Sequence, residues 1–80
     1  MPKLPQVSGQ SVIRLLRSVG YEVLRQRGSH VTLARKSPGG EHRITVPMHR
    51  TVAKGTLSDI LSQVSARVGV SREELIHRLV

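Results

Sequence analysis

Apolar residues first recur at helical spacing, and Ser8 lies just before them as a candidate N-cap. Val7 and Val12 have the spacing of a hydrophobic staple across that cap. Gly20 supplies the stop, so the pattern predicts a helix over about residues 9–19. Residues 1–7 are predicted to form a flexible N-terminal arm. The apolar positions of the helix are Val12, Ile13, Leu16 and Val19.

From Tyr21 the period of the pattern changes to two, which predicts a strand that runs to Arg27. Gly28-Ser29 is a predicted tight turn, and a second strand begins at His30. Because strand side chains alternate, Val31 and Leu33 face the core, while His30, with Thr32 and Ala34, faces the other way.

The loop over residues 37–40 reverses the chain again, and Ile44 and Val46 mark a third strand. Arg43 and Thr45 then join His30 on the open face of an antiparallel meander. Pro47 ends that strand because proline donates no ladder hydrogen bond.

The remaining pattern predicts a long helix and then a short one. Thr56 is the expected N-cap of the first, with Asp59 completing a weak capping box, and Gly69 ends it. Ser71 and Glu74 form the capping box of the short C-terminal helix, which a Val70–Leu75 staple accompanies. The chain is thus expected to be one α+β domain over residues 1–80, with helices on one face of a three-stranded antiparallel sheet.

The charge of the chain limits the kinds of partner it can have, because the sequence contains 13 Lys and Arg but only 5 Asp and Glu. Residues 1–56 carry 10 basic and 2 acidic side chains, whereas residues 57–80 carry 3 of each. This excess favours a polyanionic partner such as nucleic acid. No apolar stretch approaches the roughly 20 residues of a membrane span, and no signal peptide is expected.

The composition also limits the chemistry. There is no cysteine, which fits a reducing cytoplasm, and the four histidines lack close metal-ligand spacing, so we expect no metal. Tyr21 is the single aromatic residue besides histidine, which leaves no platform for stacking bases. RNA contacts must then rely on charge, shape and hydrogen bonds.

Cleavage of RNA through its own 2′-hydroxyl needs a base, an acid and positive charge near the phosphate. His30 lies beside such charge and is the catalytic candidate, although a histidine at a strand start is more often a plain surface residue. Gly28 and Ser29 would approach a phosphate closely, or form only a hairpin turn. The basic residues that would hold phosphate, or merely form a solvated face, are Arg25, Arg27, Lys36, Arg43 and Lys54. His49 either lines the same site or holds its loop, and His42 and His77 are predicted to be structural.

Four short motifs over about residues 8–64 resemble the HicA toxin family. They are Gly20-Tyr21, Arg25 to His30, Val46 to His49, and Lys54 to Leu57 followed by Ile60-Leu61. The resemblance implies a fold like that of double-stranded-RNA-binding domains and a ribonuclease toxin that cleaves mRNA without metal or other cofactor. It also implies a HicB-type antitoxin as partner.

Carried onto this chain, the resemblance makes His30 the essential histidine and matches His49 to a second frequent one. Val31 stands where many relatives have another histidine, and Val64 to Val68 add about one helical turn. Two alternatives stay open: a non-catalytic module that binds structured RNA through the same surface, and a protein-binding adaptor with an acidic partner.

Overall fold

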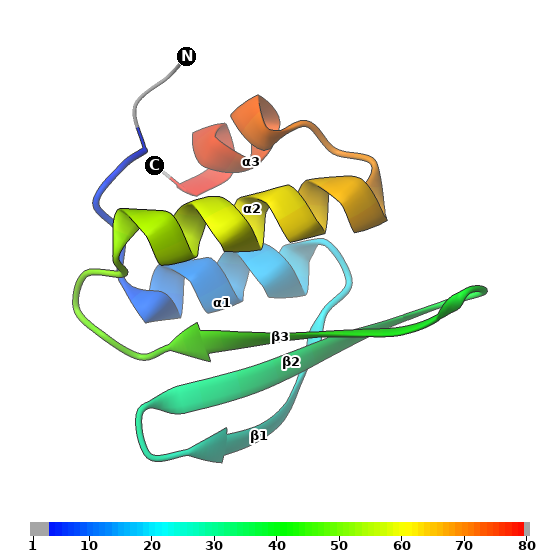
Figure 1. Ribbon diagram of the computed structural model, residues 1–80, viewed down its shortest axis with the longest axis horizontal. Coiled ribbons are helices and arrows are strands. Elements are labelled where there is room, and N and C mark those ends of the chain that lie inside the picture. Colours follow the sequence, from blue (N-terminus) through cyan, green and yellow to red (C-terminus); the bar gives the residue numbers. More distant parts are fainter. Residues whose placement is uncertain (1–3, 80) are drawn as a thin grey trace.

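The computed structural model describes residues 4–79 and has the predicted element order (Figure 1). One helix precedes three strands, and two helices follow them, which confirms the α+β class. The elements are α1 (Gly9–Ser18), β1 (Glu22–Arg27), β2 (His30–Ser37), β3 (Gly40–Pro47), α2 (Lys54–Val68) and α3 (Arg72–Leu79).

The three strands form an antiparallel meander in the order β1-β2-β3. β2 pairs with β3 along its whole length, from His30 opposite Pro47 to Ser37 opposite Gly40. Only Pro38 and Gly39 lie between these strands, so the expected four-residue loop is shorter and both strands are longer. The hairpin therefore projects past the helices (Figure 1).

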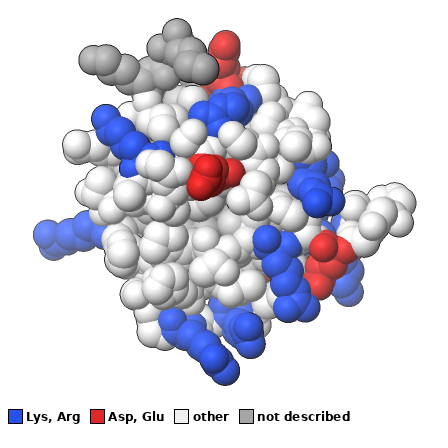
Figure 2. Space-filling view, in the orientation of Figure 1, with Lys and Arg blue, Asp and Glu red and all other residues white. Residues whose placement is uncertain are grey.

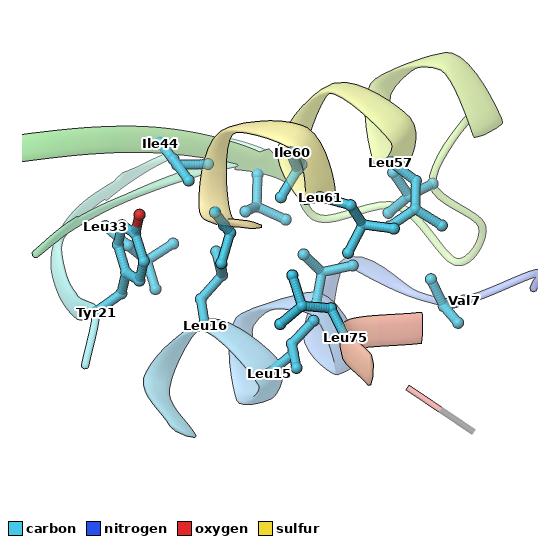
Figure 3. Close-up of a cluster of buried hydrophobic side chains, with 14 of the residues drawn as sticks. Val7, Leu15, Leu16, Tyr21, Leu33, Ile44, Leu57, Ile60, Leu61 and Leu75 are labelled. Atoms are coloured by element: carbon cyan, nitrogen blue, oxygen red, sulfur yellow. The ribbon is translucent and has the colours of Figure 1, made fainter. Parts of the chain in front are cut away.

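The helices cover one face of the sheet, and the core lies between the two layers (Figures 1 and 3). Val31, Leu33, Ile44 and Val46 supply its strand side, as the alternation predicts. The side chains that meet them from the rest of the chain include Leu15, Leu16, Tyr21, Leu57, Ile60, Leu61 and Leu75. None of the helices described within residues 4–79 lies over the opposite face of the sheet (Figure 1).

Two of the predicted helix caps are present. The Ser8 hydroxyl accepts a hydrogen bond from the Ser11 backbone N–H at 3.1 Å, and that of Ser71 accepts one from the Glu74 N–H at 3.1 Å. The Glu74 carboxylate accepts from Arg78 instead of closing a capping box.

The predicted start of α2 at Thr56 is wrong. The helix begins at Lys54, with Ala53 as an N-cap that makes no side-chain hydrogen bond. Thr56 and Asp59 thus lie inside the helix, and its first N–H groups have no side-chain cap. The stripe from Leu57 to Val64 is buried as predicted, and the helix ends before Gly69.

The start of α1 lies directly against the end of β3. The Gly9 N–H donates to the His49 carbonyl at 3.0 Å, and a Cβ on Gly9 would overlap the Pro47 carbonyl oxygen and lie 3.0 Å from Met48 Cα. Only glycine allows this approach. The sequence pattern did not reveal it.

The expected flexible arm is only partly described, because residues 1–3 lie outside the described residues. Val7 is buried, and its carbonyl accepts a hydrogen bond from the Val52 N–H at 2.8 Å. Leu4 packs against the core. Val7 therefore belongs to the fold and helps to fasten the loop between β3 and α2.

The short helix α3 is fastened to α2 by Arg72, whose guanidinium donates to the Ser58 carbonyl at 2.7 Å and to the Ser58 and Ser62 hydroxyls. Leu75 fills the core from this helix. Among residues 4–79, no helix has the length and apolar character needed to cross a membrane.

We predict that Gly9→Ala lowers the free energy of unfolding by about 1–3 kcal/mol, because the new methyl group forces the Pro47–Met48 backbone away. Gly55→Ala is the matched control, since it also lies in the first turn of a helix and its Cβ meets nothing within 4 Å. That control should be neutral or slightly stabilising. Urea unfolding of both variants measures the difference, and equal stability would contradict the packing described.

Candidate functional site

A two-residue turn delivers His30 to the start of β2. Gly28 and Ser29 separate the paired residues Arg27 and His30. Gly28 has φ +55°, whereas Ser29 has no positive φ, which is the pattern of a type II′ hairpin turn. A Cβ at Gly28 would meet nothing within 4 Å. The turn therefore favours glycine there for its positive φ and not for lack of space, and the space beside the turn is open.

The strand register places the predicted arginines beside His30. Arg27 lies opposite His30, and Arg25 lies opposite Thr32. Residues directly opposite in an antiparallel pair project from the same face. The Thr32 and Thr45 hydroxyls, 3.4 Å apart, mark that face as the one without helices. Arg25, Arg27 and His30 therefore share the open face of the sheet.

An irregularity in β1 lets the arginines lie on this face while Val23 stays opposite Leu33. The register shifts between Val23 and Arg25, so Leu24 is an extra residue in a β-bulge. In an unbroken register Gln26 would lie opposite His30, and Arg25 and Arg27 would project toward the helix side. The two-residue turn instead pairs Arg27 with His30, and the bulge at Leu24 takes up the one-residue difference from the pairing of Val23 with Leu33.

The loop after β3 joins the same end of the sheet. The Met48 N–H donates to the Ser29 carbonyl, which extends the pairing of His30 with Pro47 by one bond. His49 follows, exposed, with its carbonyl held by Gly9. We name this region the turn end, comprising residues 25–30, 47–50 and 53–56.

Lys54 is the first residue of α2, which begins at the same end of the molecule as the turn but in the helix layer, not on the open face of the sheet (Figure 1). It is exposed, as are Gly55 and Thr56. The first turn of α2 contains no acidic side chain, and Ala53 gives it no side-chain cap. The free N–H groups of the first turn of α2 and the positive end of the helix dipole therefore add to the charge of Lys54.

Arg43 lies on the same face of the sheet but farther along it. It pairs with Ala34, four residues along β3 from Pro47, a separation of about 13 Å at the usual strand rise. Its Nε is 3.0 Å from Glu41 Oε2, so part of its charge is neutralised. Ala34 is on this face as expected, but it is buried.

The turn end is cationic and open to solvent. All of residues 22–30 are exposed. Figure 2 shows basic side chains along the lower margin, where β1 lies in Figure 1, and the acidic side chains visible in this view lie elsewhere. Among residues 4–79, no group of three or more His, Asp or Glu side chains is arranged to hold a metal ion.

His42 has a different environment from His30. Its Nδ1 lies 2.8 Å from the Tyr21 hydroxyl, and its Nε2 lies 3.2 Å from Gln63 Oε1. A neutral ring that donates from Nε2 to Gln63 and accepts from Tyr21 satisfies both bonds. His42 thus links β3 to the start of β1 and to α2, which is the structural role expected for it.

A comparison with protein families matches residues 9–65 to the model described as HicA toxin of bacterial toxin-antitoxin. The chain belongs to the HicA toxin family. This HicA chain is therefore a toxin of a toxin-antitoxin system, and membership implies a cognate antitoxin as its partner. The match covers the whole turn end and leaves α3 outside. No curated protein and no solved structure gave a significant match.

Two residues that shape the site of this HicA chain were not found from the sequence. Leu24 is the bulge residue, and nothing in the run from Glu22 to Arg27 distinguishes it from a regular strand residue. Gly9 holds the loop that carries His49. A glycine at the first position of a predicted helix was the only available signal for it.

The buried Tyr21 gives the HicA fold a pH dependence. Burial raises the pKa of Tyr21 above its ordinary value, against the opposing effect of the Arg35 and Arg67 charges. The neutral phenol is favoured in the folded state. The contribution of neutral, buried Tyr21 to the free energy of unfolding is therefore complete below the ordinary pKa of about 10. It is lost as the pH rises through the raised pKa.

We predict that Tyr21→Phe costs about 1 kcal/mol of unfolding free energy at pH 7, through loss of the hydrogen bond to His42. The difference from the unmodified chain should shrink at strongly alkaline pH, because phenylalanine does not ionise. Urea unfolding at both pH values measures it. A difference that stays constant, or grows, would contradict this account.

Proposed function

We propose that this chain is an endoribonuclease that cleaves mRNA through the RNA 2′-hydroxyl, with His30 as general acid or base, and that a HicB-type antitoxin neutralises it. The observation that carries the proposal is the register that sets Arg27 opposite His30 on an open sheet face. A proton-transfer group and a phosphate-binding cation are thereby neighbours. Such a toxin acts on mRNA in the cytoplasm.

The reaction requires two proton transfers. The 2′-oxygen loses its proton and bonds to phosphorus, the bond from phosphorus to the 5′-oxygen breaks, and that leaving oxygen gains a proton. His30 performs one of these transfers, since imidazole titrates near neutral pH. His49, from the adjoining loop, or a water performs the other. No metal and no other cofactor enters this scheme.

The cations of the turn end bind the phosphate. Arg25 and Arg27 offer planar guanidinium groups to its non-bridging oxygens, where negative charge grows in the transition state. Lys54 and the uncapped start of α2 attract a neighbouring phosphate. Gly28 keeps the turn free of side-chain bulk, Ser29 offers a hydroxyl, and Arg43 meets the strand farther along the sheet.

Base stacking has no part in this recognition. Tyr21 is 1% exposed and bonded to His42, so its ring is not accessible to RNA. The open face instead presents Thr32, Thr45 and cations. RNA is accordingly held by phosphate contacts and shape, which gives binding that depends strongly on salt.

The alternative is a module that binds structured RNA without cleaving it. One observation favours it: among the described residues, no hydrogen bond orients the His30 imidazole. The same surface serves both functions, and they differ only in what His30 does once RNA is bound.

We predict that His30→Ala reduces RNA cleavage at least 100-fold, because a positioned proton-transfer group contributes about 10²–10⁴. RNA affinity should change little and growth arrest on expression should disappear. His77→Ala, an exposed histidine on α3, is the matched control and should cleave RNA and arrest growth normally. Retention of cleavage by His30→Ala would contradict the catalytic role of His30, whereas absence of cleavage by the unmodified chain would favour the non-catalytic module.

We predict that Arg25→Gln/Arg27→Gln weakens RNA binding uniformly across sequences and lowers the slope of log affinity against log salt by about 1 per lost contact. Arg14→Gln/Arg67→Gln removes the same charge from exposed positions on α1 and at the far end of α2. Filter binding over a range of salt compares the two. An equal loss in both variants would show that net charge, rather than the turn end, governs binding.

A further inference from the structure

β1 carries apolar side chains that the fold does not use. All six of its residues are exposed, and Val23 and Leu24, at 48% and 47%, are the exposed large hydrophobic residues among those described. They are adjacent on one strand at the bulge. Tyr21, just before the strand, is the residue of this segment that packs in the core, and Val23 and Leu24 stay outside it.

Within residues 4–79, no strand pairs with the outer edge of β1. β1 is the first strand of the sheet and bonds only to β2. Figure 1 shows β1 at the margin of the sheet, away from α2 and α3. An exposed strand edge presents N–H and C=O groups that can pair with another extended segment.

Two hollows flank this strand, one on each face. Leu24 borders a hollow of about 220 Å³, which is also lined by Ala34 and Lys36. Val23 borders one of about 320 Å³ together with Arg17 and Glu22. The alternating side chains of an added strand would enter the two hollows in turn, since strand side chains project to opposite faces.

The charge beside this edge selects an acidic segment. Arg25 and Arg27 project from β1 itself, Arg17 lies beside Val23 and Lys36 beside Leu24. The carboxylates near the strand are those of Glu22 and Glu41, and Glu41 is paired with Arg43. A second copy of the chain would bring a second net charge of +8 to the same place. Carboxylates on a partner strand would instead pair with the arginines.

We propose that the antitoxin inhibits this chain by adding an extended, acidic strand to the β1 edge, with apolar side chains over Val23 and Leu24. This rests on the proposed function, in which a protein partner neutralises the toxin. The added strand occupies the two arginines that bind phosphate, so the antitoxin and RNA compete for Arg25 and Arg27 while His30 keeps its geometry.

The test uses Val23→Ser/Leu24→Ser, with the purified antitoxin encoded beside the toxin as the probe. We expect this variant to bind the antitoxin at least 10-fold more weakly by calorimetry. Gln10→Ser/Arg14→Ser, an exposed pair on α1, should bind normally. Hydrogen exchange of the unmodified chain should show new protection of the amides of residues 22–27 when the antitoxin is added. These readouts do not depend on whether the chain cleaves RNA.

An unchanged affinity in the β1 variant, with circular dichroism showing that it is folded, would overturn the proposal. Protection that appears on α1 or α3 and not on β1 would do the same. Sedimentation that shows the free chain to be a dimer, lost in the β1 variant, would assign the edge to a second copy instead. RNA cleavage by Val23→Ser/Leu24→Ser that resists the antitoxin would support competition at this edge.

Discussion

The pairing of β1 with β2 is the constraint on which the site depends. A two-residue turn fixes Arg27 opposite His30 and, in the same register, Arg25 opposite Thr32, while the bulge at Leu24 lets Val23 lie opposite Leu33. Side chains alternate along a strand, so a shift of one residue would send both arginines to the other face of the sheet. The cationic character of the open face is thus a consequence of register as much as of composition.

Backbone hydrogen bonds hold the rest of the turn end against this hairpin. Met48 bonds to Ser29, Gly9 to His49, and Val52 to Val7. These bonds connect the turn, the loop after β3 and the start of α1, which are far apart in the sequence. The candidate groups are therefore carried by backbone that is fixed at several points, while their side chains remain exposed to a large substrate.

Much of the fold could be predicted because its core has strong periodicity. The two helix caps at Ser8 and Ser71, the strand alternation of Val31 and Leu33, and the end of α2 all follow from local chemistry. The start of α2 was placed too late because Thr56 is a good capping residue, whereas Ala53 gives no capping signal.

The site was less predictable, because its geometry depends on pairing between strands. His30, Gly28 and the arginines stand out by residue type, yet regular alternation from Val23 would have set Arg25 and Arg27 toward the helix side. Only the bulge reverses that direction, and a bulge has no reliable signal in a single sequence. The same is true of Gly9, whose role depends on backbone about 40 residues away.

The most direct measurement is a ¹H–¹⁵N NMR titration with RNA that carries 2′-deoxy groups and so resists cleavage. We expect the shifts to concentrate in residues 25–32 and 47–56, with α3 and the exposed side of α1 unaffected. Shifts that centre on α1 and α3, with the hairpin turn unchanged, would contradict the assignment of the turn end as the RNA site.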